Sequence, residues 1–79
     1  MSEQIEQRVK TLLAKVMRVD VSTVTADAST DSMVAWDSLN HIKLVLALEE
    51  EFDLALDESQ IEKMTSVAKV VSVIAQLRM

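Results

Sequence analysis

The feature of this 79-residue chain that most limits its fold is the complete absence of glycine and proline. These two residues supply the positive backbone angles and the rigid turns that tight β-hairpins use most. Alanine, leucine, glutamate and lysine, all strong helix formers, are abundant instead. Because 49% of the residues are hydrophobic, the chain is also too apolar for a disordered segment. We therefore expect an all-α fold, with residues 1–79 forming a single domain.

Apolar residues recur at helical spacing in three long segments. We expect main helices at about 2–18, from 37 or 38 to near 52, and from about 66 to 77, the last with Thr65 as its N-cap. A short helix should precede the last one, because Asp57 and Gln60 have the spacing of a capping pair. The sequence thus predicts a four-helix bundle with three main helices and a short third helix. The apolar face expected for the second helix consists of Leu39, Ile42, Val45, Leu46, Leu48 and Phe52.

A long loop, residues 19–36, should join the first two main helices. It is rich in serine, threonine and aspartate, which favour turns and caps over helix interiors. Its apolar residues are expected to pin it to the core: Val21, Val24, Met33 and Val34. Trp36, the only tryptophan, stands at the end of the loop as either a buried anchor or a contact for a partner.

The charge is concentrated in one part of the chain. The formal net charge is −5, and residues 37–58 hold seven acids and a single base, Lys43. Such a segment repels nucleic acid and attracts basic protein surfaces. It could equally be the solvated face of a helix.

Several functions are excluded or disfavoured by composition. The chain has no cysteine, hence no thiolate nucleophile, no disulfide and no cysteine zinc site. A metal site is not expected, because there is one histidine and the carboxylates do not follow a calcium-loop pattern. The N-terminus has no signal-peptide core, and no apolar run reaches the length of a membrane span, so a cytoplasmic protein is expected.

Asp37, Ser38 and His41 lie within five residues of each other, which raises the question of a catalytic triad. A serine nucleophile needs a base and preorganised oxyanion donors, and the glycine-flanked elbow of serine hydrolases is missing. Ser38 could simply cap a helix or lie on its surface. It could also be an attachment point, because a phosphate ester in the first turn of a helix gains from free backbone N–H groups and from the helix dipole.

Two stretches resemble the acyl carrier protein family. "DSLNHIKLVLALEEEF", residues 37–52, is similar to the family's central signature, and "LDESQIEKMTSVAKVV", residues 56–71, is similar to its third helix and the start of its fourth. The resemblance implies that Ser38 carries 4′-phosphopantetheine, transferred from coenzyme A by a phosphopantetheinyl transferase. The arm's thiol would hold an acyl group as a thioester, and the protein would be a substrate of other enzymes rather than a catalyst.

The resemblance also implies roles for neighbouring residues. The partners would be biosynthetic enzymes with basic docking surfaces, and the carrier would be a monomer. His41 would be exposed, one turn beyond Ser38. The recognition residues would be Asp37, Leu39, Asn40, His41, Lys43, Glu49, Glu50 and Asp53. The residues around the acyl tail, which are also ordinary core residues, would be Ile42, Leu46, Leu48, Ile61 and Met64.

This sequence departs from the family pattern at four positions. Ala35 and Trp36 stand where many members have glycine, and Asn40 and Lys43 stand where carriers of fatty acid synthesis often have acids. The departures indicate a carrier for a specialised lipid, polyketide or other pathway. The rivals are an aminoacyl or peptidyl carrier of the same fold, an unmodified helical adaptor and, more distantly, a small hydrolase.

Overall fold

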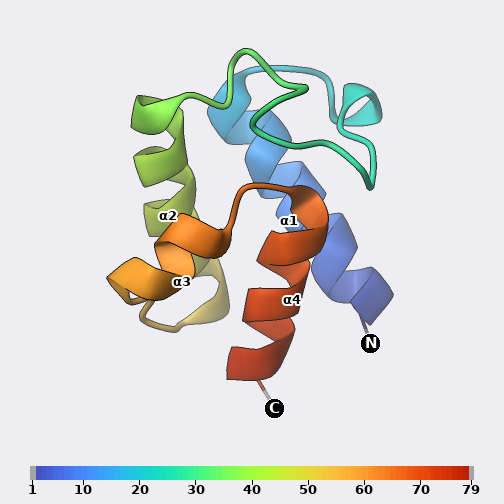
Figure 1. Ribbon diagram of the computed structural model, residues 1–79. Coiled ribbons are helices and arrows are strands. Elements are labelled where there is room, and N and C mark those ends of the chain that lie inside the picture. Colours follow the sequence, from blue (N-terminus) through green and yellow to red (C-terminus); the bar gives the residue numbers. More distant parts are fainter. Residues whose placement is uncertain (1, 79) are drawn as a thin grey trace.

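The computed structural model describes the backbone of residues 2–78 and the side chains of residues 4–78. It confirms the all-α fold and the order of its helices (Figure 1). The chain forms α1 (Ser2–Met17), a 3-10 turn η1 (Val21–Thr23), α2 (Ser38–Phe52), α3 (Glu58–Lys63) and α4 (Val67–Leu77). The short α3 crosses near the end of α2, and the long loop covers the other end of the bundle (Figure 1). None of the described helices is long and apolar enough to cross a membrane.

The core lies where α1 packs against α2 and α4. On α2 the buried residues are Leu44, Val45, Leu48 and Phe52. The sequence-based face for this helix was partly wrong, because Leu39, Ile42 and Leu46 are 54–65% exposed. These three residues follow each other at spacings of three and four, so they form a second apolar stripe on the outside of the helix. The side chains that are completely buried in the core include Val9, Leu13, Leu44, Leu48, Met64, Val70 and Ile74.

Three apolar side chains of the long loop are buried against the bundle: Val24, Ala28 and Trp36, each at most 5% exposed. Met33 is partly buried against the same core, as expected. Trp36 is therefore the buried anchor that the sequence offered as one of two alternatives. Val21 and Val34 do not pin the loop as expected, being 42% and 97% exposed. Two backbone hydrogen bonds also attach the loop to the bundle. Thr30 N donates to Thr65 O and Val67 N donates to Ala28 O, each with an N···O distance of 2.9 Å.

The helix ends follow most of the expected capping chemistry. The carboxylate of Asp57 accepts from Gln60 N, and the Gln60 side chain accepts from Asp57 N, which completes the predicted capping box. The N-cap of α4 is Ser66, one residue beyond the expected Thr65, because the Ser66 hydroxyl accepts from Lys69 N. Among the described residues, Asp53 (φ 51°) after α2 and Arg18 (φ 59°) after α1 take the left-handed conformation.

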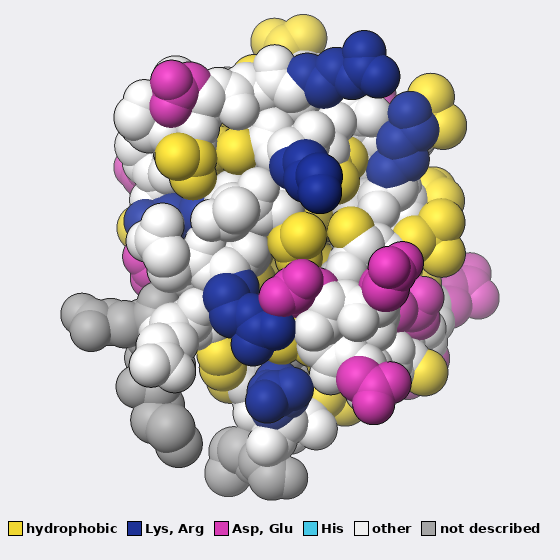
Figure 2. Space-filling view, turned by 180° about the vertical axis from the view of Figure 1, so that it is seen from behind, with side chains coloured by type: hydrophobic (Ala, Val, Ile, Leu, Met, Phe, Trp, Pro, Cys, Tyr) yellow, Lys and Arg dark blue, Asp and Glu magenta, His cyan; other side chains and the backbone are white. Residues whose placement is uncertain are grey.

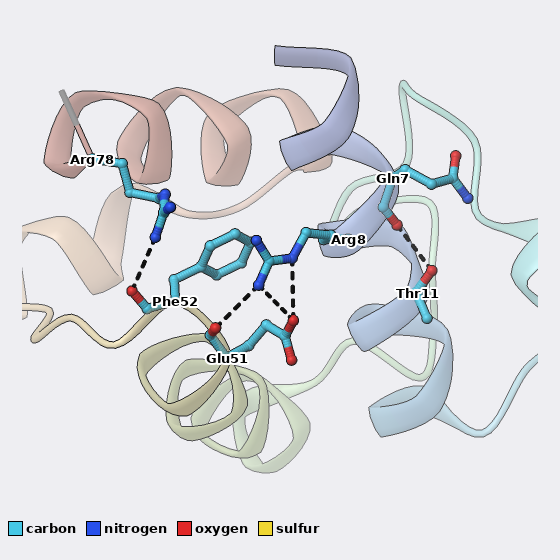
Figure 3. A network of polar contacts seen from close by, with 6 residues as sticks. All are labelled: Gln7, Arg8, Thr11, Glu51, Phe52 and Arg78. Carbon is cyan, nitrogen blue, oxygen red and sulfur yellow. Dashed lines mark hydrogen bonds and ion pairs between the residues drawn. The ribbon is translucent and has the colours of Figure 1, made fainter. Parts of the chain in front are cut away.

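Two arginines bracket the end of α2 (Figure 3). Arg8 of α1 lies over the Phe52 ring, 4.3 Å from its centroid, and pairs with the Glu51 carboxylate at 2.6 Å. Arg78, just after α4, donates to Phe52 O over 3.3 Å. The end of α2 is thereby tied to both neighbouring helices. The ion pair is about two-fifths exposed, so its contribution to stability is small, about 0–1 kcal/mol.

Candidate phosphopantetheine attachment site

Ser38 is the first residue of α2, and its side chain is exposed. The N-cap is the preceding residue, since the Asp37 carboxylate accepts from Asn40 N over 2.9 Å. The Ser38 hydroxyl forms no hydrogen bond within the described residues. Because Asp37 already caps the helix, capping does not explain a serine at position 38, and its hydroxyl is accessible to a reagent or an enzyme.

Two free backbone donors lie in the same helical turn as this hydroxyl. The N–H groups of Ser38 and Leu39 lie in the first turn of α2, and neither has a hydrogen-bond partner in the part of the chain that the structure describes. Together with the dipole of a 15-residue helix, these donors favour negative charge next to Ser38. A phosphodiester on this hydroxyl therefore fits its surroundings.

His41 links three segments close to Ser38. Trp36 Nε1 donates to His41 Nδ1 over 2.9 Å, and His41 Nε2 lies 2.9 Å from the carbonyl oxygen of Ile61. Since Nδ1 accepts, the ring proton is on Nε2 and is donated to Ile61 O. The expectation that His41 is exposed was wrong, because this half-buried ring connects the loop, α2 and α3. Both of its nitrogens are engaged, so His41 is not placed to act as a base for Ser38.

An open pocket of about 540 Å³, here called the Ser38 pocket, begins at the serine. Its walls come from the loop, from the start of α2 and from the end of α3, and its surface is mostly apolar. A flexible chain attached to Ser38 has room to lie there, so the residues present fit a phosphopantetheine arm. The lining includes Trp36, Ser38, His41, Ile42, Ile61 and Thr65. The sequence did not indicate that Thr65 lies near Ser38, because only the fold brings the segment between α3 and α4 next to α2.

The five residues expected around an acyl tail do not line one cavity. Ile42 and Ile61 line the Ser38 pocket. Leu48 and Met64 are completely buried in the core, and Leu46 is 61% exposed on the outer face of α2. On α2 the sequence did not separate the exposed Leu46 from the buried Leu48, because the two apolar stripes of this helix are interleaved along the chain.

The residues expected to recognise partners also separate into two groups. Asp37, Leu39, Lys43, Glu50 and Asp53 are exposed. In contrast, the Asn40 side chain donates to Ala35 O at an N···O distance of 2.7 Å, and the Glu49 carboxylate accepts from Leu56 N at 2.8 Å. Asn40, Glu49 and His41 thus have internal hydrogen-bonding roles.

The acidic end of α2 is explained in part by these internal contacts. An acid is unfavourable at the C-terminal end of a helix, where the dipole is negative. Glu49 compensates by accepting from the following loop, and Glu51 compensates by pairing with Arg8.

Acidic side chains gather at the lower right of the face opposite to Figure 1, beside a band of basic ones (Figure 2).

Comparison with known proteins agrees with this geometry. Residues 7–74 match the family model described as the phosphopantetheine attachment site. The chain belongs to the acyl carrier protein family. It is 36% identical over 74 residues to an acyl carrier protein of Akkermansia muciniphila, covering 94% of this chain and 92% of the relative. It is 33% identical over 76 residues to an acyl carrier protein of Picosynechococcus, covering 96% and 94%.

A solved structure gives the same result at the level of the fold. The chain superimposes on a Mycobacterium tuberculosis protein, described as a candidate acyl carrier protein, with a TM-score of 0.82 and 25% identity. The match covers 92% of this chain and 97% of the other. Acyl carrier proteins hold their cargo on a covalent 4′-phosphopantetheine and are carriers rather than catalysts. Membership of the family therefore identifies the cofactor of this chain and its general role.

Proposed function

We propose that Ser38 is the residue that carries 4′-phosphopantetheine, and that residues 1–79 act as one carrier domain for a specialised biosynthetic pathway. The observation that carries the proposal is the exposed Ser38 hydroxyl, which has unpaired backbone N–H groups beside it and a pocket next to it. The serine oxygen would bond to the phosphorus that carries the pantetheine of coenzyme A as the P–O bond to 3′,5′-ADP breaks, and a base of the transferase or water would take the hydroxyl proton. When bound, the arm supplies the thiol that this cysteine-free chain lacks.

The chain's own residues would then position the arm. The N–H groups of Ser38 and Leu39 would hold the phosphodiester, and the helix dipole would add to the attraction. Asp37 keeps this turn of α2 in place through its bond to Asn40 N. The His41 links to Trp36 and Ile61 keep the walls of the Ser38 pocket together.

Partner enzymes would dock on the outer face of α2. There the exposed stripe of Leu39, Ile42 and Leu46 offers apolar area next to the attachment point. Apolar residues exposed side by side favour an interaction surface. The exposed acids Glu50 and Asp53 lie farther along the same helix and its cap, and would attract a basic partner surface. The partners would be a phosphopantetheinyl transferase and the enzymes that load and use the acyl group, and the carrier would act as a monomer.

Transfer of the arm tests this proposal. The protein is incubated with coenzyme A, magnesium and a broad-specificity transferase, and its intact mass is measured. Wild type and Ser59→Ala, which alters another exposed helical serine, should both gain one phosphopantetheine, whereas Ser38→Ala should gain none. A wild-type protein that remains unmodified would instead favour a helical adaptor.

A further inference from the structure

A second pocket adjoins the Ser38 pocket. It has a volume of about 530 Å³ and lies between the end of α3 and α4. The two pockets share two lining residues, Glu62 and Thr65. An arm that starts at Ser38 and lies along the first pocket would therefore direct its free end towards the second.

The lining of this second pocket, here called the lysine pocket, differs from that of the Ser38 pocket. It includes Lys63, Lys69, Ser72 and Gln76, all exposed hydrogen-bonding side chains. Lys69 Nζ lies 3.4 Å from Thr65 Oγ1, which places its ammonium group at the boundary between the two pockets. Among the described side chains, neither Lys63 nor Lys69 forms an ion pair. Two ammonium groups, a hydroxyl and an amide around one pocket match the hydrogen-bonding needs of a carboxylate.

The lining of the lysine pocket is basic, although the chain as a whole is acidic. The chain as a whole has a net charge of −5, so a negatively charged group is repelled by most of its surroundings. The lysine pocket retains a local positive balance, because Lys63 and Lys69 outnumber Glu62. Another basic pocket, with Lys15, Arg18 and Lys43 in its lining, lies between α1 and α2 and shares no lining residue with the Ser38 pocket.

We propose that the lysine pocket binds the far-end carboxylate of a carboxyl-terminated acyl cargo while the arm lies in the Ser38 pocket. The inference rests on the proposed attachment at Ser38 and adds a cargo class to it. Lys63 and Lys69 pair with the carboxylate, and Ser72 and Gln76 donate further hydrogen bonds. An uncharged acyl chain of the same length gains none of these contacts.

The test compares two cargoes of equal chain length, glutaryl and pentanoyl. Each is loaded with its pantetheine arm from the corresponding coenzyme A thioester, and loading is verified by intact mass. Backbone amide shifts of Lys69, Ser72 and Gln76 are then compared by NMR, and both loaded proteins are melted at low salt. The glutaryl form should move these amides and melt a few degrees higher than the pentanoyl form.

Matched variants locate the effect. Lys63→Gln/Lys69→Gln should abolish the difference between the two cargoes. Lys15→Gln/Arg18→Gln removes the same charge from the other basic pocket and should preserve the difference. Successful loading with equal amide shifts and melting temperatures for both cargoes would overturn the inference alone. Failure to load Ser38 would overturn the proposed attachment as well.

Discussion

The indole nitrogen of Trp36 lies 2.9 Å from Nδ1 of His41, and the planes of the two rings are 29° apart. Trp36 is only 3% exposed, so its N–H depends on this histidine for a partner. Through Nε2 the same ring reaches Ile61 O at the end of α3. His41 thus holds the loop before the attachment site against two helices.

We expect His41→Ala to destabilise the protein by about 1–3 kcal/mol, because it leaves the Trp36 N–H and the Ile61 carbonyl group without partners. Thermal melts followed by Trp36 fluorescence measure the loss. Ile42→Ala, an exposed neighbour on α2, is the control and should melt close to wild type. A His41→Ala protein that melts like wild type would show that the links through this ring contribute nothing to stability.

The left-handed residue after α2 gives a second prediction. Asp53 has φ 51° and ψ 58°, a conformation that costs a residue with a Cβ more than it costs glycine. Asp53→Gly should therefore stabilise the protein by about 1 kcal/mol in denaturant unfolding. Glu50→Gly, three residues earlier and inside the helix, should destabilise it by about the same amount. Destabilisation by both variants would contradict the role assigned to the Asp53 conformation.

A third prediction separates the exposed acids from those with internal contacts. If Glu50 and Asp53 steer basic partners, Glu50→Gln/Asp53→Asn should slow association with a transferase and flatten its dependence on salt. Asp20→Asn/Asp27→Asn removes two charges from the loop and should leave both properties nearly unchanged. Stopped-flow association at several ionic strengths distinguishes these cases. Equal salt dependence in all three proteins would leave the α2 acids with a solubilising role only.

Lys43 gives a fourth prediction, which the structure sharpens. The sequence singled out Asn40 and Lys43 as departures from the family pattern, but Asn40 donates to Ala35 O and an aspartate could not. Only the exposed Lys43 can be tested without disturbing the loop. Loaded Lys43→Glu should be elongated several-fold better by a fatty acid ketosynthase, as expected for about 1 kcal/mol. Equally efficient use of wild type and Lys43→Glu would argue against a specialised carrier.

Most of the fold could be predicted because helix signals in this chain are local. The capping pair at Asp57 and Gln60 depends on residues three positions apart, and the structure confirms it. The two faces of α2 could not be separated from sequence. Leu44 and Leu46 are both leucines on the same helix, yet they are 0% and 61% exposed. The position of α1, which is distant in the sequence, determines which of the two leucines is buried.

The candidate site was predictable in part for the same reason. Ser38, Asp37 and the helix that follows form a continuous segment that sequence can describe. The partner of His41 Nε2 is a backbone carbonyl 20 residues away. Because every residue has a backbone carbonyl, the amino-acid sequence does not show which one a side chain will contact. Likewise, Thr65 lines the Ser38 pocket because the segment between α3 and α4 passes next to it, which the residue type alone does not indicate.

The most direct test of the central claim is to locate the arm on the chain. Trypsin should release residues 19–43 of the transferase-treated protein as one peptide, which contains Ser38 together with the serines and threonines of the loop. Tandem mass spectrometry of this peptide assigns the added mass to one residue. We predict that all of the phosphopantetheine is on Ser38. Phosphopantetheine on any other hydroxyl of the peptide, or on a different peptide, would contradict the account.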